Sequence, residues 1–435
     1  MYRKLILSLL PMAFAMSLSA QQAMRLSDAI DYALANHTEV RIANLNVTDA
    51  EWRYKENRAL GYPHLSIGMN YQHFLQQPAI PAEALGFEGA EPGQKITFAL
   101  QNNLNGKIEL NQLLFNNTYF TGLRAVKLYR EYVQLELNSV KEKVRNNVRD
   151  AYLPALALTR SVEVLDSNIL NQEKLFTETR AIYTAGFAEQ LDVDRIELIL
   201  STLKTERENF LRQKSTAIDV LKYTMNMPVS TDVTLSDDLE GLLDQYASID
   251  PDEKLDYMNR PDYITILKSQ ELNEVQVDFY KKDWLPRVSM FASYDPTFQG
   301  NKELFWIPSA IAGVSVQMNI YDGGYALAKK ERAIIDALKV EEQKKFLLEG
   351  YDLAIENARD QYRSAKQNLD EIERNLALAQ RIRLAAESKF KAGIGSSFEV
   401  TQAQSGFFQA QGNLVNAQFD LLKSIIAINR ALGKT

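Results

Sequence analysis

The stretch YTAGFAEQLDV at residues 183–193 recurs in altered form as FKAGIGSSFEV at residues 390–400. In both copies a glycine, Gly186 or Gly393, follows an alanine at the end of a long periodic segment. This is the pattern of a helix that ends in a glycine of left-handed conformation. An acidic residue stands six positions after each glycine. The sequence therefore predicts two reversals, each joining two long helices.

The two reversals belong to a repeat that extends over most of the chain. The two glycines are 207 residues apart, whereas NHTE at 36–39 and NRPD at 259–262 are 223 residues apart. The difference of 16 residues falls between Gln72 and Lys107, where prolines and glycines predict an exposed loop. A unit of roughly two hundred residues is too long for a solenoid repeat, so we predict a duplicated architecture with internal pseudo-symmetry.

Long helices are expected on both sides of the reversals. Between Val133 and Ile169 apolar residues recur at a mean spacing of 3.6, the period of a straight α-helix rather than of a two-stranded coiled coil. We expect helices over about 118–182 and about 325–390, each on the order of 100 Å long. Pro154 lies inside the first of them and predicts a kink or break near its middle.

Each half also contains a pair of segments in which apolar and polar residues alternate, within about 64–113 and about 286–321. The apolar positions are Leu65, Ile67, Met69, Tyr71, Ile96, Phe98, Leu100, Ile108, Leu110, Val288, Met290, Ala292, Tyr294, Val314, Val316, Met318 and Ile320. A membrane β-strand needs this pattern because lipid lies on one side and water on the other. Four strands of a soluble sheet are the alternative, although aromatic residues crowd the segment ends as in an interfacial girdle.

Four membrane strands cannot close a barrel by themselves, because an open edge cannot face lipid and about eight strands are the usual minimum. A membrane-spanning chain must therefore form an oligomer, and this arithmetic permits two, three or four copies. The predicted fold class is an α+β membrane protein with a long α-helical barrel. Four transmembrane β-strands per chain would complete an oligomeric β-barrel.

The predicted domain boundaries follow from the repeat and from the N-terminus. Residues 1–20 have a basic start, an apolar segment and small residues before a cleavage site, the order of a secretory signal peptide. The first repeat then occupies 21–228 and the second 259–435. Residues 229–258 are acidic, and we expect a solvated linker, or equatorial segment, packed outside the helical barrel. Their carboxylate spacing fits no calcium loop.

Composition excludes several classes of protein. The formal net charge of −7 supplies no basic face for nucleic acid. Without cysteine the chain has no disulfide, thiolate metal site or cysteine nucleophile, and its three histidines have no paired helical spacing. No polar constellation with catalytic spacing is present, so we predict no enzymatic activity, no cofactor and no metal.

Taken together, these features resemble the TolC-type outer-membrane efflux family. The two reversal motifs, NRPD at 259–262 and AINRALG at 427–433 are similar to that family's motifs, in its order and spacing, and the match covers essentially the whole mature chain. The resemblance implies a homotrimer in which a twelve-stranded β-barrel stands on an α-helical barrel. It also implies a location in the cell outer membrane, extending into the periplasm.

The resemblance assigns roles to the two tips, at 183–190 and 391–397. It implies docking of an adaptor on Ala185, Gly186, Phe187, Ala392, Gly393, Ile394 and Gly395. Asp192 and Glu399 stand where the family has acidic residues near a closed entrance, so three chains would form a ring of carboxylates that favours cations. A helix-capping role within Ser396–Glu399 is the alternative for Glu399. Gln402, where the family often has a second acidic residue, argues against strong cation selectivity.

The predicted function is an outer-membrane channel-tunnel of a tripartite efflux or type I secretion system. It would give passive passage across periplasm and outer membrane when docked to its partners. Those partners are a periplasmic adaptor (membrane fusion) protein and an inner-membrane pump, together with outer-membrane lipid, and no nucleic acid. A soluble periplasmic coiled-coil scaffold or adaptor without a pore is the alternative.

Overall fold

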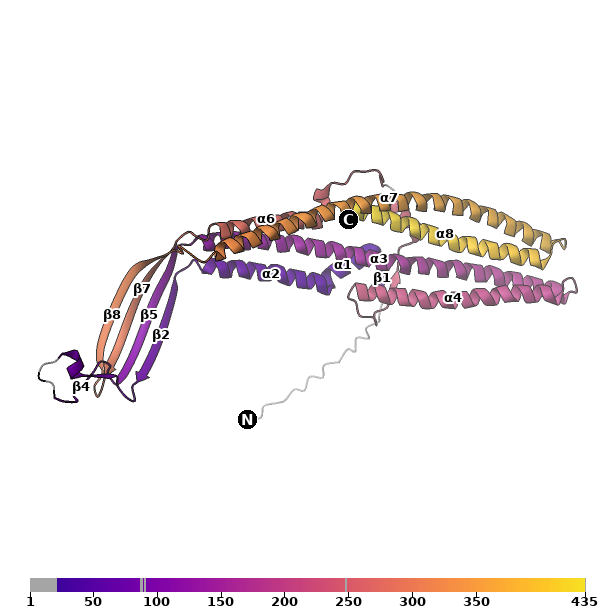
Figure 1. The fold of residues 1–435 in the computed structure, drawn as a ribbon. Coiled ribbons are helices and arrows are strands. Elements are labelled where there is room, and N and C mark those ends of the chain that lie inside the picture. Colours follow the sequence, from indigo (N-terminus) through magenta and orange to yellow (C-terminus); the bar gives the residue numbers. More distant parts are fainter. Residues whose placement is uncertain (1–21, 87–88, 90, 247–248, 435) are drawn as a thin grey trace, which may run out of the picture. The chain divides into compact units, whose positions relative to one another are not determined.

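A computed structural model describes residues 22–86, 89, 91–246 and 249–434, so the predicted signal peptide lies outside the described residues. Long helices and one larger sheet make up most of the described chain (Figure 1). The elements of the first half are β1 (Gln22–Met24), α1 (Leu26–Asn36), α2 (Thr38–Ala59), β2 (His64–His73), β3 (Ala79–Pro81), η1 (Ala82–Leu85), β4 (Lys95–Thr97), β5 (Asn102–Phe115), α3 (Asn117–Thr184) and α4 (Gln190–Thr224). Those of the second half are β6 (Val233–Leu235), α5 (Leu239–Tyr246), η2 (Tyr257–Asn259), α6 (Pro261–Lys281), β7 (Arg287–Gly300), β8 (Phe305–Gln317), α7 (Tyr325–Lys391) and α8 (Ser397–Ala431).

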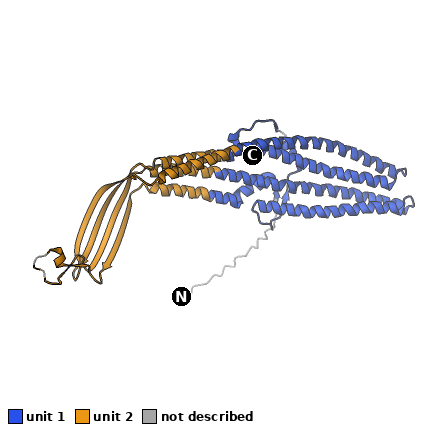
Figure 2. Ribbon diagram, viewed as in Figure 1, with its two compact units in different colours: residues 1–44, 136–263, 346–435 blue, residues 45–135, 264–345 orange. Residues whose placement is uncertain are grey.

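The chain divides into two compact units, and each draws on both halves of the sequence (Figure 2). Unit 1 contains the described residues of 1–44, 136–263 and 346–435, and unit 2 contains 45–135 and 264–345. The element lengths of the two halves correspond, with 68 residues in α3 against 67 in α7, and 35 in both α4 and α8.

Unit 2 contains a four-stranded antiparallel sheet in the order β2-β5-β7-β8. Its register places Ile67, Ile108 and Tyr294 in one row across three strands. Because side chains alternate between the faces of a strand, one face of the sheet is apolar on all four strands. The residues of this apolar face include Leu65, Ile67, Met69, Leu104, Ile108, Leu110, Val288, Met290, Val314 and Val316. The apolar face is not covered by unit 2, since Leu65, Ile67 and Met69 are each about three-quarters exposed, at 74%, 75% and 74%.

The strand predicted to return through Ile96, Phe98 and Leu100 begins later than expected. Ile96 lies in β4, which pairs with β3 in a separate two-stranded sheet. Phe98 and Leu100 lie outside any strand. The reason is pairing, because β2 ends at His73 opposite Asn102 and offers no partner to earlier residues.

The last strand ends earlier than predicted. β8 stops at Gln317, so Met318 and Ile320 follow the strand although their alternation continues. Gln317 pairs with Arg287, the first residue of β7. The residue before Arg287 is Pro286, which has no backbone N–H to donate to a neighbouring strand.

Helix α3 is continuous through Pro154, so of the predicted kink or break the break is wrong. The residues around the proline are fully or nearly fully buried, as Tyr152, Leu153 and Ala155 show. Packing on this scale can hold a helix together where one backbone hydrogen bond is lost. The predicted 3.6-residue stripe is confirmed along α3. Its buried members are Val133, Leu137, Val144, Val148, Ala155, Val162, Leu165 and Ile169.

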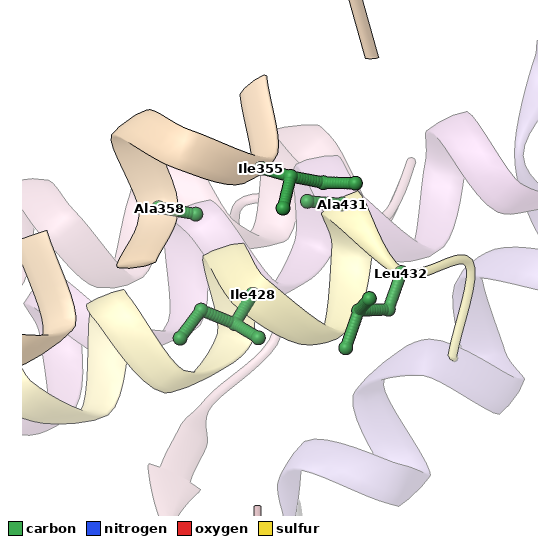
Figure 3. Close-up of a cluster of buried hydrophobic side chains, with 5 residues drawn as sticks. All are labelled: Ile355, Ala358, Ile428, Ala431 and Leu432. Atoms are coloured by element: carbon green, nitrogen blue, oxygen red, sulfur yellow. The ribbon is translucent and has the colours of Figure 1, made fainter. Parts of the chain in front are cut away.

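A buried cluster in unit 1 joins α7 to the end of α8. Ile355 and Ala358 come from α7, and Ile428, Ala431 and Leu432 come from the end of α8 and the residue after it (Figure 3). All five side chains are less than one-tenth exposed. Burial of the larger members contributes about 1.5–3 kcal/mol each to folding relative to an exposed side chain.

The NRPD motif holds the end of α8 to the start of α6. The Arg260 guanidinium donates to the backbone oxygen of Arg430 at 2.6 Å and to the Asp262 carboxylate at 3.0 and 3.2 Å. It also lies over the Tyr351 ring, 4.4 Å from its centroid. Burial by itself raises the pKa of the Asp262 carboxyl, but the hydrogen bonds and the charge of Arg260, together with the neighbouring Tyr351 hydroxyl, outweigh it and hold the pKa below its usual value.

The acidic segment at 229–258 is more ordered than the solvated linker that we predicted. It contains β6, which pairs in parallel with β1, and the helix α5. The Asp237 carboxylate accepts hydrogen bonds from the Leu26 backbone N–H at 2.7 Å and from the Tyr152 hydroxyl at 2.8 Å. Further along, Arg359 donates to two backbone oxygens of the segment. Asp237 therefore caps α1 and contacts α3, while the backbone of the segment binds Arg359 of α7.

Candidate functional site

The two tips are left-handed glycine turns of one type. Gly186 has φ of +82° and Gly393 has φ of +74°. At the first tip the N–H groups of Gly186 and Phe187 donate to the oxygens of Tyr183 and Ile182. At the second tip the same pair of bonds runs from Gly393 and Ile394 to residues 390 and 389. These are the two bonds of a Schellman motif, so both glycines have the helix-ending role that the sequence predicts.

The residue after each glycine projects into solvent. Phe187 is 86% exposed and Ile394 is 80% exposed. Ala185 and Ala392, just before the glycines, are also exposed. Beneath the tips, a cluster of Leu175, Ile196, Ala386 and Val400 packs all four long helices of unit 1 together. Each tip thus presents one large apolar side chain on a turn whose supporting helices are packed.

Gly395 has a different role from Gly393. Its backbone N–H donates to the Lys389 oxygen at 3.1 Å, as that of Ile394 does. A Cβ on Gly395 would lie 2.9 Å from the Cβ of Lys389 and 3.0 Å from the backbone nitrogen of Phe390. The absence of a side chain therefore lets the turn close tightly onto the end of α7.

Asp192 links the starts of two helices. Its carboxylate accepts the Glu189 backbone N–H at 3.0 Å, which caps α4. The same carboxylate accepts the hydroxyl of Ser397, the first residue of α8. Ser397 is fully buried and accepts a hydrogen bond from the Arg195 guanidinium at 3.1 Å. We call Asp192, Ser397 and Arg195 the tip latch, because this hydroxyl connects α4 to α8 through two charged partners.

Glu399 is placed differently from Asp192, although both stand six residues after a tip glycine. The Glu399 backbone N–H donates to Ser396 Oγ at 3.3 Å, so Ser396 caps α8. A bond from the Ser396 backbone N–H to the Glu399 carboxylate, which would complete a capping box, is absent among the described residues. The Glu399 carboxylate is exposed. The structure therefore leaves it available to solvent, to ions or to another chain.

A groove of about 530 Å³ lies beside Glu399, between α7 and α8. Small residues of both helices line it, among them Ala385, Ala403 and Gly406, while Glu399 and Lys389 add charge. Small side chains let a further helix approach closely. Sequence reasoning did not identify this groove, because its alanines and glycine lie on two helices and form one surface only when these helices pack.

The described residues contain neither of two other features. No group of three or more His, Asp or Glu side chains in the described part of the chain is arranged to hold a metal ion. Within the same residues, none of the helices is both long enough and apolar enough to cross a membrane.

Residues 259–434 match the model of a family described as outer membrane efflux protein. The pyoverdine export outer membrane protein OpmQ of Pseudomonas putida is 20% identical over 422 residues, which cover 94% of this chain and 85% of that protein. Nodulation protein T of Rhizobium leguminosarum bv. trifolii is 21% identical over 369 residues, which cover 82% of this chain and 78% of that protein.

Solved structures of outer-membrane proteins share the fold over nearly the whole chain. The outer membrane protein VceC of Vibrio cholerae superposes with a TM-score of 0.72 at 14% identity, covering 94% of this chain and 96% of VceC. The CmeC outer membrane channel of Campylobacter jejuni gives 0.72 at 13% identity, covering 94% and 85%. These findings and the family match confirm the resemblance to the TolC-type outer-membrane efflux family and the predicted location in the outer membrane.

Proposed function

We propose that this chain, an outer-membrane protein with the resemblance and fold just described, is the channel-tunnel of a tripartite efflux or type I secretion system. It gives passive passage across the periplasm and outer membrane when docked to an adaptor and an inner-membrane pump. One observation carries the proposal, namely a four-stranded sheet whose apolar face is exposed on every strand. In a soluble scaffold this apolar face would remain exposed to water, which is energetically unfavourable.

The open edges of the sheet support a trimer. β2 and β8 are the outer strands, and each leaves one row of backbone groups without a partner strand among the described residues. In lipid these groups must be paired, so the edges of neighbouring copies join. Three copies of four strands give a closed barrel of twelve, within the range of natural outer-membrane barrels. The apolar face then meets lipid and the polar face encloses water.

The tips are the proposed docking site for the adaptor. Phe187 and Ile394 are the most exposed large apolar side chains there, and each directly follows a glycine of left-handed conformation. An amphipathic helix of a partner can take such side chains as anchors while lying along the small-residue groove. Glu399 supplies the exposed carboxylate of the proposed constriction, whereas Asp192 acts in the tip latch.

A pair of neighbouring substitutions in β8 tests the membrane assignment. Val316 lies on the apolar face opposite Val288, and Ser315 lies on the other face opposite Ser289. An arginine on the lipid-facing side costs about 2–4 kcal/mol at mid-bilayer and less towards the interface, so Val316→Arg, near the end of β8, should still reduce trimers recovered from outer-membrane fractions more than Ser315→Arg. Equal yields of trimer from both variants would contradict a lipid-facing apolar surface, and full extraction of the wild type without detergent would favour the soluble scaffold.

A further inference from the structure

The polar face of the sheet has an apolar region that lies mainly on one strand, β8. On β2 this face carries the small or polar residues Ser66, Gly68, Asn70 and Gln72, with His64 at the strand end. On β8, residues 305, 307 and 311 of the same face are Phe305, Ile307 and Ile311. They are 59%, 48% and 56% exposed. The opposite face of β8 is apolar as well, so this strand lacks the alternation that the other strands keep.

A carboxylate lies beside these apolar side chains. Asp295 on β7 stands directly opposite Ser309, whose neighbours two residues away on β8 are Ile307 and Ile311. Diagonal neighbours of this kind are within about 7–8 Å, close enough for long side chains to meet one molecule. One aromatic ring extends the surface, because Phe291 lies across Gly313, where a Cβ would come 2.9 Å from the ring.

The Asp295 carboxylate retains capacity for a cation. Among the described residues its one hydrogen bond comes from Ser293 Oγ, at 2.9 Å. Lys107 lies near enough to interact electrostatically with Asp295, but its ammonium forms its salt bridge with Glu109 at 2.7 Å. The three charged groups therefore leave one net negative charge beside the exposed Ile307 and Ile311.

Lipid or a second copy of the chain does not account for this surface. The opposite face is apolar on all four strands and is the one suited to lipid, while a neighbouring strand would add beside β8 rather than over its face. We propose that Asp295, Ile307 and Ile311, with Phe291 at one end, form a contact site for lipophilic cations in transit. The inference rests on the proposed function, because it takes the polar face to line the passage.

The chemistry of the occupant follows from the two kinds of contact. A cation with a hydrated shell gains little from isoleucine, and a neutral hydrocarbon gains nothing from Asp295. An organic cation whose charged centre is surrounded by aromatic or alkyl groups is attracted by the Asp295 carboxylate. It also buries apolar surface against Ile307 and Ile311 and can lie against the ring of Phe291. Protonated or quaternary amphiphiles are thus the favoured class.

Binding of tetraphenylphosphonium to the purified trimer in detergent tests the site without requiring an open channel. We expect Ile311→Ser to weaken binding about 5-fold, as loss of part of an apolar contact does. Asp295→Asn should weaken it about 10-fold, because the charge partner is lost. Asn70→Ser, on the same face of β2, should bind as the wild type does, and protein-free micelles give the background uptake. Tetramethylammonium should compete poorly.

Equal binding by all four proteins, or effective competition by tetramethylammonium, would overturn the proposal. Conductance of the same proteins in planar bilayers separates this failure from failure of the proposed function. If the wild type conducts but tetraphenylphosphonium does not block it preferentially, the result contradicts the cation site but not the channel function. Absence of conductance in every variant, the open-tip variants described below included, would remove the channel itself and with it the basis of the inference.

Discussion

The tip latch predicts that Ser397→Ala favours an open channel. The substitution removes a single buried oxygen and introduces no bulk, so the packing of α8 is preserved. It breaks the bond to the Asp192 carboxylate and the bond from Arg195, which together tie α4 to α8. Hydrogen bonds to charged groups contribute about 1.5–3 kcal/mol each. Asp192 and Arg195 are only half-buried, however, and water can replace part of what they lose.

We therefore expect a net loss of about 2 kcal/mol, close to the contribution of one such bond. Since 1.4 kcal/mol is a tenfold change in an equilibrium, the ratio of open to closed tips should rise ~30-fold. The measurement is single-channel open probability in planar bilayers without the adaptor. Entry of a large antibiotic that intact outer membranes exclude gives a second readout in cells.

Ser396→Ala is the matched control for this prediction. Ser396 is the neighbouring serine, is exposed and caps α8 through the Glu399 N–H, so its loss costs about 1 kcal/mol of helix stability without touching the latch. In an Asp192→Asn background, Ser397→Ala should add much less than it does alone, because the two residues act as one unit. Wild-type open probability in Ser397→Ala, or the same increase in Ser396→Ala, would refute the reasoning.

Three further predictions concern the tips and the NRPD motif. Gly393→Pro should abolish adaptor-dependent transport while trimers persist in the membrane, since proline excludes the positive φ and removes the N–H that donates to the oxygen of residue 390. Normal transport by this variant would mean that the adaptor does not dock at this tip. Glu399→Gln should lower the cation preference measured from reversal potentials in a salt gradient, and an unchanged preference would leave only the cap formed by its backbone. Because the folded pKa of Asp262 is depressed, its stabilisation is present above its unfolded pKa, about 3.9, and is lost as pH falls through the folded value. The difference in melting temperature between wild type and Asp262→Asn should therefore be largest near pH 7 and shrink as the pH falls below about 3.9, and a difference independent of pH would contradict it.

Local signals made the long helices and their ends predictable. The 3.6-residue spacing along α3 needs only neighbouring residues to be read, and the glycines at 186 and 393 mark turns whose bonds close within six residues. Pro154 shows the limit of a local signal, since its intrinsic effect was correct but the packing of Tyr152, Leu153 and Ala155 prevails. The predicted strand ends were wrong for a related reason, because alternation of apolar and polar residues does not indicate where the partner strand stops.

Contacts between distant residues were beyond sequence reasoning. Ser397 and Asp192 are 205 residues apart, and Asp237 reaches Leu26 across 211 residues. No spacing in the sequence indicates either contact, because both depend on which helices pack side by side.

The apolar residues on the polar face of β8 were missed for another reason. A segment that is apolar on both faces has no period of two, so the alternation used to find strands does not detect Ile307 or Ile311.

The two tip carboxylates show how corresponding positions can acquire different roles. Asp192 and Glu399 occupy the same place relative to their glycines, and the sequence alone treats them as equivalent members of one ring. Asp192 is half-buried and is committed twice, to the cap of α4 and to Ser397, so little of its charge is free for an ion. Glu399 is exposed and makes neither kind of bond through its carboxylate among the described residues. Neutralising Glu399 should therefore change selectivity with little effect on opening, whereas neutralising Asp192 should change opening first.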